Sequence, residues 1–162
     1  MDASGITLFV GDDNQDRQYR SILSFDTSSL PDGAVITEVT LKVKSNGIVG
    51  TNPFSILGGL LVDVRKGTFS GDPTLQAQDF QAWANVGSVG KVPNSPNNSG
   101  WYHKTWTTGI LDYINKQGRT QLRLRFSTGD NDNLIADYIR FYSGNATTTT
   151  YRPQLIVQYY VP

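Results

Sequence analysis

A period of two runs through residues 35–44, the longest segment of the sequence with a strand-like pattern. In it the apolar residues Val39, Leu41 and Val43 alternate with Thr40, Lys42 and Lys44. Because successive side chains of a β-strand point to opposite faces, this alternation predicts a strand with one buried face and one solvated face. No comparable helical period is found in the chain, so strands are expected to dominate the fold.

The composition supports a fold made of strands and turns. The acidic residues are thirteen Asp and a single Glu, and Gly, Ser, Thr and Asn make up about a third of the chain. Glu favours helices, whereas Asp, Asn, Ser and Gly favour turns. With 162 residues, the chain has the length of one domain, residues 1–162.

About eight strands are predicted, with turn-rich segments between them. They are residues 6–10, 19–25, 35–44, 60–64, 101–106, 120–126, 138–142 and 154–160. Short helices are expected at 76–84 and 110–115, and a long surface loop at 87–100. The prediction is an all-β fold, a two-sheet antiparallel β-sandwich of jelly-roll type, and an open barrel is the alternative.

Several strands and their turns resemble those of the DNRLRE modules, also called disaggregatase-related modules, which overlap with the family 96 carbohydrate-binding modules. The matching stretches are Tyr19-Arg20-Ser21-Ile22-Leu23-Ser24-Phe25-Asp26, Leu30-Pro31-Asp32-Gly33-Ala34, Ile36-Thr37-Glu38-Val39-Thr40-Leu41, Trp106-Thr107, Phe141-Tyr142-Ser143 and Arg152-Pro153-Gln154-Leu155-Ile156-Val157. Residues 54–100 follow the family pattern poorly. The resemblance implies a jelly-roll accessory domain of a secreted microbial protein, which in some members binds acidic polysaccharide such as alginate.

Charges on the strands predict a basic sheet face. Residues 120–126 alternate like residues 35–44, with Leu122, Leu124 and Phe126 on one face and Arg123 and Arg125 on the other. In a jelly roll the third and sixth strands are neighbours, which would place Lys42 and Lys44 beside these two arginines. Four such cations would suit a polymer of carboxylated sugars. The alternative is that they only solubilise an exposed face.

The aromatic residues are divided between core and surface. Trp83, Trp106, Phe25 and Phe141 are expected in the core, whereas Trp101 and Tyr102 occupy opposite faces of one strand, so that one of them should be exposed. Tyr138, beside Arg140, is a further candidate for sugar contact. The residues predicted to be nearly fully buried are Leu41, Val43, Leu122, Leu124, Phe126, Ile139, Phe141 and Val157.

Two acidic turns contain the oxygen ligands that calcium accepts. The first holds Asp12, Asp13 and Asp16, and the second holds Asp130 and Asp132. A bound structural Ca²⁺ would fasten a loop. The alternative is that these Asp residues are ordinary turn formers. Neither turn is an EF-hand.

Neither catalysis nor binding to nucleic acid or membrane is indicated. His103 is the only His, Cys is absent, and no Gly-x-Ser-x-Gly sequence occurs. Fourteen basic and fourteen acidic residues cancel, so no overall field would attract DNA or an anionic membrane. The expectation is a non-catalytic module that binds an anionic polysaccharide, monomeric, within a larger extracellular or cell-surface protein. The alternative is a structural spacer or adhesion module without a sugar ligand.

Overall fold

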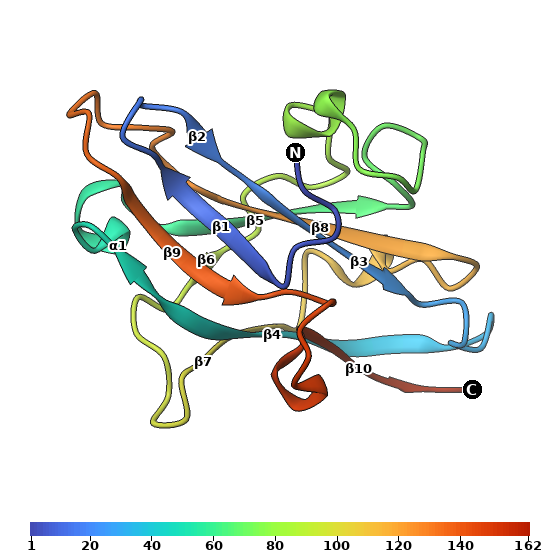
Figure 1. The fold of residues 1–162 in the computed structure, drawn as a ribbon. Coiled ribbons are helices and arrows are strands. Elements are labelled where there is room, and N and C mark those ends of the chain that lie inside the picture. The colour runs from blue at the N-terminus through green and yellow to red at the C-terminus, as the bar shows by residue number, and fades with distance from the viewer.

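Two antiparallel β-sheets packed face to face make up the structure, a computed structural model that describes residues 1–162 (Figure 1). The first sheet contains β1 (Thr7–Asp12), β2 (Gln18–Tyr19), β4 (Val35–Val49), β7 (Trp101–Trp106), β9 (Asp137–Tyr142) and β10 (Gln154–Tyr160). The second contains β3 (Ser21–Asp26), β5 (Leu60–Lys66), β6 (Lys91–Val92) and β8 (Arg119–Phe126). The predicted two-sheet sandwich is confirmed. No helix is long and apolar enough to cross a membrane.

The strand order is that of a jelly roll. In the first sheet β9 lies between β1 and β4, and β7 pairs with β4; in the second the order is β3-β8-β5-β6. The chain passes from one sheet to the other at six of its nine strand connections, and between β2 and β3 it does so across the single residue Arg20. β10 is an addition at the edge of the first sheet, beside β4.

Helical structure is limited to single turns. They are α1 (Pro53–Ile56), η1 (Ala77–Phe80), η2 (Leu111–Tyr113) and η3 (Thr149–Tyr151). The prediction of a helix over 76–84 is therefore wrong, apart from the single 3₁₀ turn η1. The carbonyls of Phe80 and Ala82 instead accept hydrogen bonds from the side chains of Arg20, which lies just before β3, and Arg123 of β8.

The core lies between the sheets and follows the period of two. Of the eight residues predicted to be buried, seven are at most 1 % exposed: Leu41, Val43, Leu122, Leu124, Phe126, Ile139 and Phe141. Val157 is only half-buried because β10 lies at a sheet edge. Trp106 is buried and Phe25 half-buried, but Trp83, expected in the core, is 68 % exposed.

Four aromatic rings connect the two sheets through the core. Phe126 of β8 meets Phe54 of α1 edge-on, Phe54 stacks on Tyr102 of β7, and Tyr102 contacts Phe141 of β9 edge-on. Centroid separations of 5.1–5.6 Å are those of favourable aromatic pairs. Tyr102, a candidate for sugar contact, is therefore a core residue, 3 % exposed.

Candidate functional site

The four cations predicted to form one patch are divided between the two sheets. Lys42 and Lys44 lie on β4 of the first sheet, whereas Arg123 and Arg125 lie on β8 of the second. The prediction that these four cations form one contiguous patch is therefore wrong. The physical reason is the two-residue strand β6, which sequence patterns do not reveal. With β6 counted, the sixth jelly-roll strand is β7, and it is β7 that pairs with β4.

Arg123 and Arg125 belong to a buried ion-pair cluster around Asp63 of β5. Both guanidinium groups contact the Asp63 carboxylate, with N–O distances of 2.9 Å and 3.0 Å. Arg123 is 5 % exposed and also donates to the carbonyls of Asp79 and Ala82, so the loop after β5 covers it. Arg123 therefore holds that loop against β8, and its outward position in the strand does not make it accessible.

Burial opposes ionisation of Asp63, but hydrogen bonds from Arg125, the Ser88 amide and Arg123 outweigh it and hold the pKa of Asp63 below 3.8. A lowered folded-state pKa contributes stability that is complete above the unfolded value and is lost as the pH falls through the folded value. We therefore expect wild-type protein to lose its advantage over Asp63→Asn in acid. Urea unfolding of both proteins between about pH 6 and about pH 2.5 measures this. A difference that stays constant below pH 3.8 would contradict the assignment.

A second set of residues gathers on the outer face of the first sheet. Lys42 lies opposite His103, and Lys44 lies opposite Trp101, in the register of β4 with β7. The ammonium groups of Lys42 and Lys44 lie 5.0 Å and 5.6 Å from the centre of the Trp101 ring. These are cation–π distances, so the half-buried indole holds both lysines on this face.

Aromatic rings continue this face over β9 and β1. In their register Phe9 lies opposite Arg140, and Tyr138 lies opposite Gly11. The rings of Phe9, Tyr19 and Tyr138 contact one another at 5.5–5.7 Å. Tyr142 contacts Tyr151 at 4.9 Å, and Lys44 lies 4.7 Å from the centre of the Tyr151 ring.

Gly11 allows the rings of Tyr19 and Tyr138 to meet, because it lies between them in the sheet. A Cβ atom at this position would lie 2.8 Å from Cβ of Tyr138, and the φ angle of +138° also favours glycine. The aromatic–basic face is thus defined by Phe9, Tyr19, Lys42, Lys44, Trp101, His103, Tyr138, Arg140, Tyr142 and Tyr151.

The cations of the aromatic–basic face have no acidic partners. The three salt bridges in the structure join Arg17 to Asp13 and Arg123 and Arg125 to Asp63. Lys42, Lys44 and Arg140 take part in none of them, and the buried Nε of Arg140 has no hydrogen-bond acceptor. Three positive charges among aromatic rings are therefore without a counter-charge.

Of the predicted contact residues, the structure brings together Lys42, Lys44, Trp101, Tyr138 and Arg140 on this face, and it excludes Tyr102, Arg123 and Arg125. It adds Phe9, Tyr19, His103, Tyr142 and Tyr151. The period of two in residues 138–142 would have identified Tyr142, since it shares a face with Tyr138 and Arg140. Tyr151 lies in η3, outside any strand, and no sequence pattern indicates its position.

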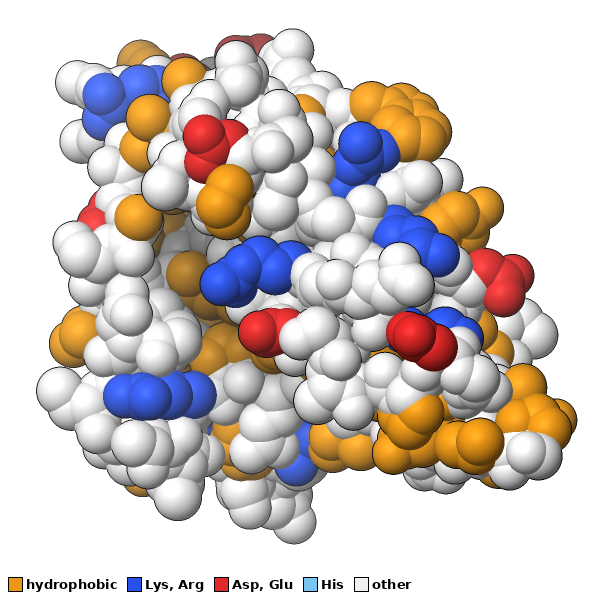
Figure 2. Space-filling model, turned by 90° about the vertical axis from the view of Figure 1, so that its right-hand side faces the viewer, with side chains coloured by type: hydrophobic (Ala, Val, Ile, Leu, Met, Phe, Trp, Pro, Cys, Tyr) orange, Lys and Arg blue, Asp and Glu red, His pale blue; other side chains and the backbone are white.

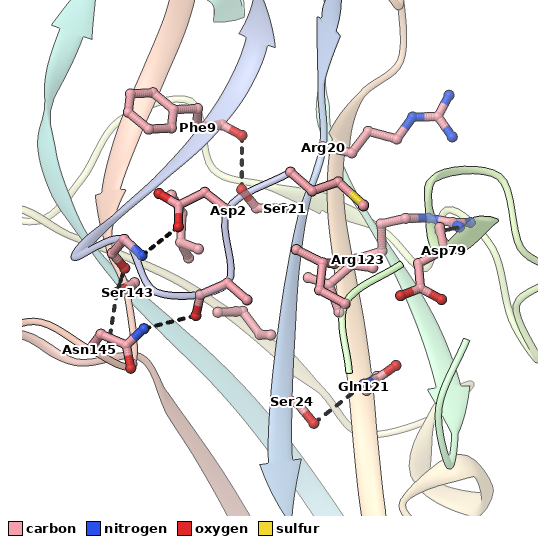
Figure 3. Close-up of a pocket in the computed structure, with 18 of the residues that line it drawn as sticks. Asp2, Phe9, Arg20, Ser21, Ser24, Asp79, Gln121, Arg123, Ser143 and Asn145 are labelled. Atoms are coloured by element: carbon pink, nitrogen blue, oxygen red, sulfur yellow. Dashed lines mark hydrogen bonds between the residues drawn. The ribbon is translucent and has the colours of Figure 1, made fainter. Parts of the chain in front are cut away.

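A groove of about 970 Å³ adjoins the face, and Phe9 and Tyr19 are among its lining residues. β3 runs along it, with Phe9 on one side and Asp79 and Arg123 on the other (Figure 3). A view of one side of the molecule shows a hollow with hydrophobic side chains in its floor and Lys or Arg side chains beside it (Figure 2). The groove offers mainly hydroxyl, amide and apolar groups.

The acidic turns have different environments. Hydrogen bonds from the Arg17 side chain lower the pKa of Asp13 to about 2, and Asp16 accepts the amide of Leu134. Asp12 is fully buried, and this burial, together with the charges of Asp137 and Asp130, raises its pKa. No group of three or more Asp, Glu or His side chains is arranged as a metal site. Asp137, which lies next to Asp12, escaped the sequence prediction because it belongs to a strand.

No protein-family model matches the sequence, and no curated protein matches it significantly.

Proposed function

We propose that this molecule is a non-catalytic carbohydrate-binding module, and that it binds an anionic polysaccharide such as alginate or another polyuronate across the aromatic–basic face. The observation that carries the proposal is the position of Lys42, Lys44 and Arg140. All three lie among aromatic rings, and none is paired with a carboxylate.

Sugar rings and carboxylates would contact different groups on this face. The apolar faces of pyranose rings pack on aromatic side chains, for which Trp101, Phe9 and the tyrosines are placed. Each carboxylate would accept hydrogen bonds from a cation, with Arg140 suited to two parallel bonds and the lysines acting as point charges. The resemblance of several strands to DNRLRE modules implies the same class of ligand, in a secreted protein.

Replacing Lys42 and Lys44 together by Ala is expected to weaken binding to alginate by about 1–3 kcal/mol, the usual loss for a charged hydrogen-bonding partner. Binding of wild-type protein should also weaken with salt, because exposed charges are screened. Affinity electrophoresis in gels loaded with alginate, pectin or a neutral glucan, supported by calorimetric titration, measures both effects.

The matched control is Lys66→Ala with Lys91→Ala, which removes two exposed lysines from the second sheet and leaves the net charge the same as in the test variant. Its affinity for alginate should equal that of the wild type. Equal affinity of all three proteins would contradict the assignment of the face. If wild-type protein bound no polyanion at low salt, the molecule would be better described as a spacer or adhesion module.

A further inference from the structure

Two buried carboxylates face each other, one at the end of β1 and the other at the start of β9. Asp12 and Asp137 are directly opposite in the antiparallel register, and both are 0 % exposed. Neither forms a salt bridge, since no Lys, Arg or His nitrogen lies within ion-pair distance. Like charges at directly opposite positions repel each other, and burial increases the cost. The fold therefore leaves a buried negative charge without a counter-charge.

The hydrogen bonds around this pair are incomplete. Asp137 accepts bonds from the Thr51 amide at 2.6 Å and from the side chains of Asn131 and Asn133 at 3.4 Å and 3.1 Å. Asp12 Oδ2 accepts the Asn131 amide at 3.2 Å. The second carboxylate oxygen of Asp12, Oδ1, and the only side-chain oxygen of Asn131, also Oδ1, are buried and have no donor. Buried oxygens in native proteins nearly always have a partner, so these two indicate a missing cation or donor.

Three segments distant in sequence enclose these oxygens. They are the end of β1, the residues after β4 and the loop between β8 and β9. Gly50, at φ +72°, packs so closely that a Cβ there would lie 2.7 Å from Oδ1 of Asp137. Asp130, in the same loop, is near enough for its charge to act on Asp12. The fold therefore fixes the positions of these three segments, and the side chains that they contribute carry oxygen atoms.

We infer that Asp12, Asp137 and Asn131 bind a calcium ion, which joins the start of β9 and the loop before it to the end of β1. The three side chains offer only oxygen, the ligand that Ca²⁺ prefers, and no nitrogen or sulfur atom of the kind that zinc favours. Calcium takes six to eight oxygen ligands in flexible geometry, so main-chain carbonyls and water would complete the shell. The two acidic turns of the sequence thus contribute to one site, and Asp13 and Asp16 serve as loop contacts.

The first test uses the whole chain, freed of metal with a chelator and then titrated with CaCl₂. We expect the melting temperature to rise by roughly 5–10 °C at a calcium concentration about 100 times the dissociation constant, because the ion binds the folded state. Mg²⁺ at the same concentration should give a smaller rise, since it demands stricter octahedral geometry. A melting temperature unchanged by Ca²⁺, with no heat of binding in calorimetry, would overturn the inference.

The second test is Asp12→Asn. This change removes one carboxylate of the opposed pair, so the metal-free variant should melt at or above the temperature of the metal-free wild type and lose the calcium response. Asp132→Asn is the matched control, because it removes an exposed carboxylate of the same loop and Asn tolerates the φ angle of +53° there. It should keep the full response. An Asp12→Asn variant that responds to Ca²⁺ like the wild type would overturn the inference. Neither test involves a polysaccharide, so each result is independent of the proposed sugar binding.

Discussion

Replacing Asp63 by Ala is expected to lower the free energy of unfolding by about 3–5 kcal/mol, the usual effect of removing one member of a buried ion pair. The cause is the guanidinium of Arg123, which is 5 % exposed and would keep only its two bonds to loop carbonyls. Arg125, whose side chain is 22 % exposed, would lose the same partner. Urea unfolding at neutral pH, followed by circular dichroism, measures the loss.

Two comparisons separate this effect from ordinary loss of a surface charge. Lys66→Ala removes an exposed cation of β5 that forms no salt bridge, and it should change the free energy of unfolding by no more than about 0.5 kcal/mol. Adding Arg123→Met to Asp63→Ala should recover part of the stability, because it removes the unpaired buried charge. If Asp63→Ala cost no more than Lys66→Ala, Asp63 would not be the buried partner that supports Arg123 and Arg125.

Replacing Phe126 by Ala is the second change with a large expected effect, a loss of about 3–5 kcal/mol. Phe126 is 1 % exposed and begins the series of rings that continues through Phe54 and Tyr102 to Phe141. Its removal takes apolar area out of the core and leaves a cavity between sheets whose backbones cannot close over it.

Equilibrium unfolding in urea measures this change, with Phe9→Ala as the control. Phe9 is 36 % exposed on the outer face of the first sheet, so its truncation should alter stability far less. A loss below about 1 kcal/mol for Phe126→Ala would mean that the core collapses around the missing ring.

Local sequence patterns predicted which side chains point into the core, because the period of two is a property of a single strand. Leu122, Leu124 and Phe126 confirm this. The same pattern also placed Arg123 outward, and in the strand it does point away from the core. Whether an outward side chain is exposed depends on what covers the sheet, and the loop after β5 is remote in sequence. A local signal of this cover existed, since Asp63 interrupts the otherwise apolar residues 60–64.

The aromatic–basic face could be predicted only in part, because it depends on which strands are neighbours. Lys42, Lys44 and Trp101 were identified separately, but their contact follows from the pairing of β4 with β7. The opposed carboxylates are a similar case. Asp12 and Asp130 were identified in two separate turns, but only the pairing of β1 with β9 places Asp137 opposite Asp12.

The winding of the chain between the two sheets also determines when this protein can fold during synthesis. The strand at the centre of the first sheet, between β1 and β4, is β9, and the strand that joins β3 to β5 in the second sheet is β8. Both come late in the chain, after residue 118. A nascent chain that ends before β8 would lack the central strand of each sheet. Pairing of strands that are distant in sequence is also slow, on the order of milliseconds to seconds. The ribosome therefore releases most of this sequence before either sheet can be completed, and β1, β3 and β5 lack their neighbours β9 and β8 until the last third of the chain has been made.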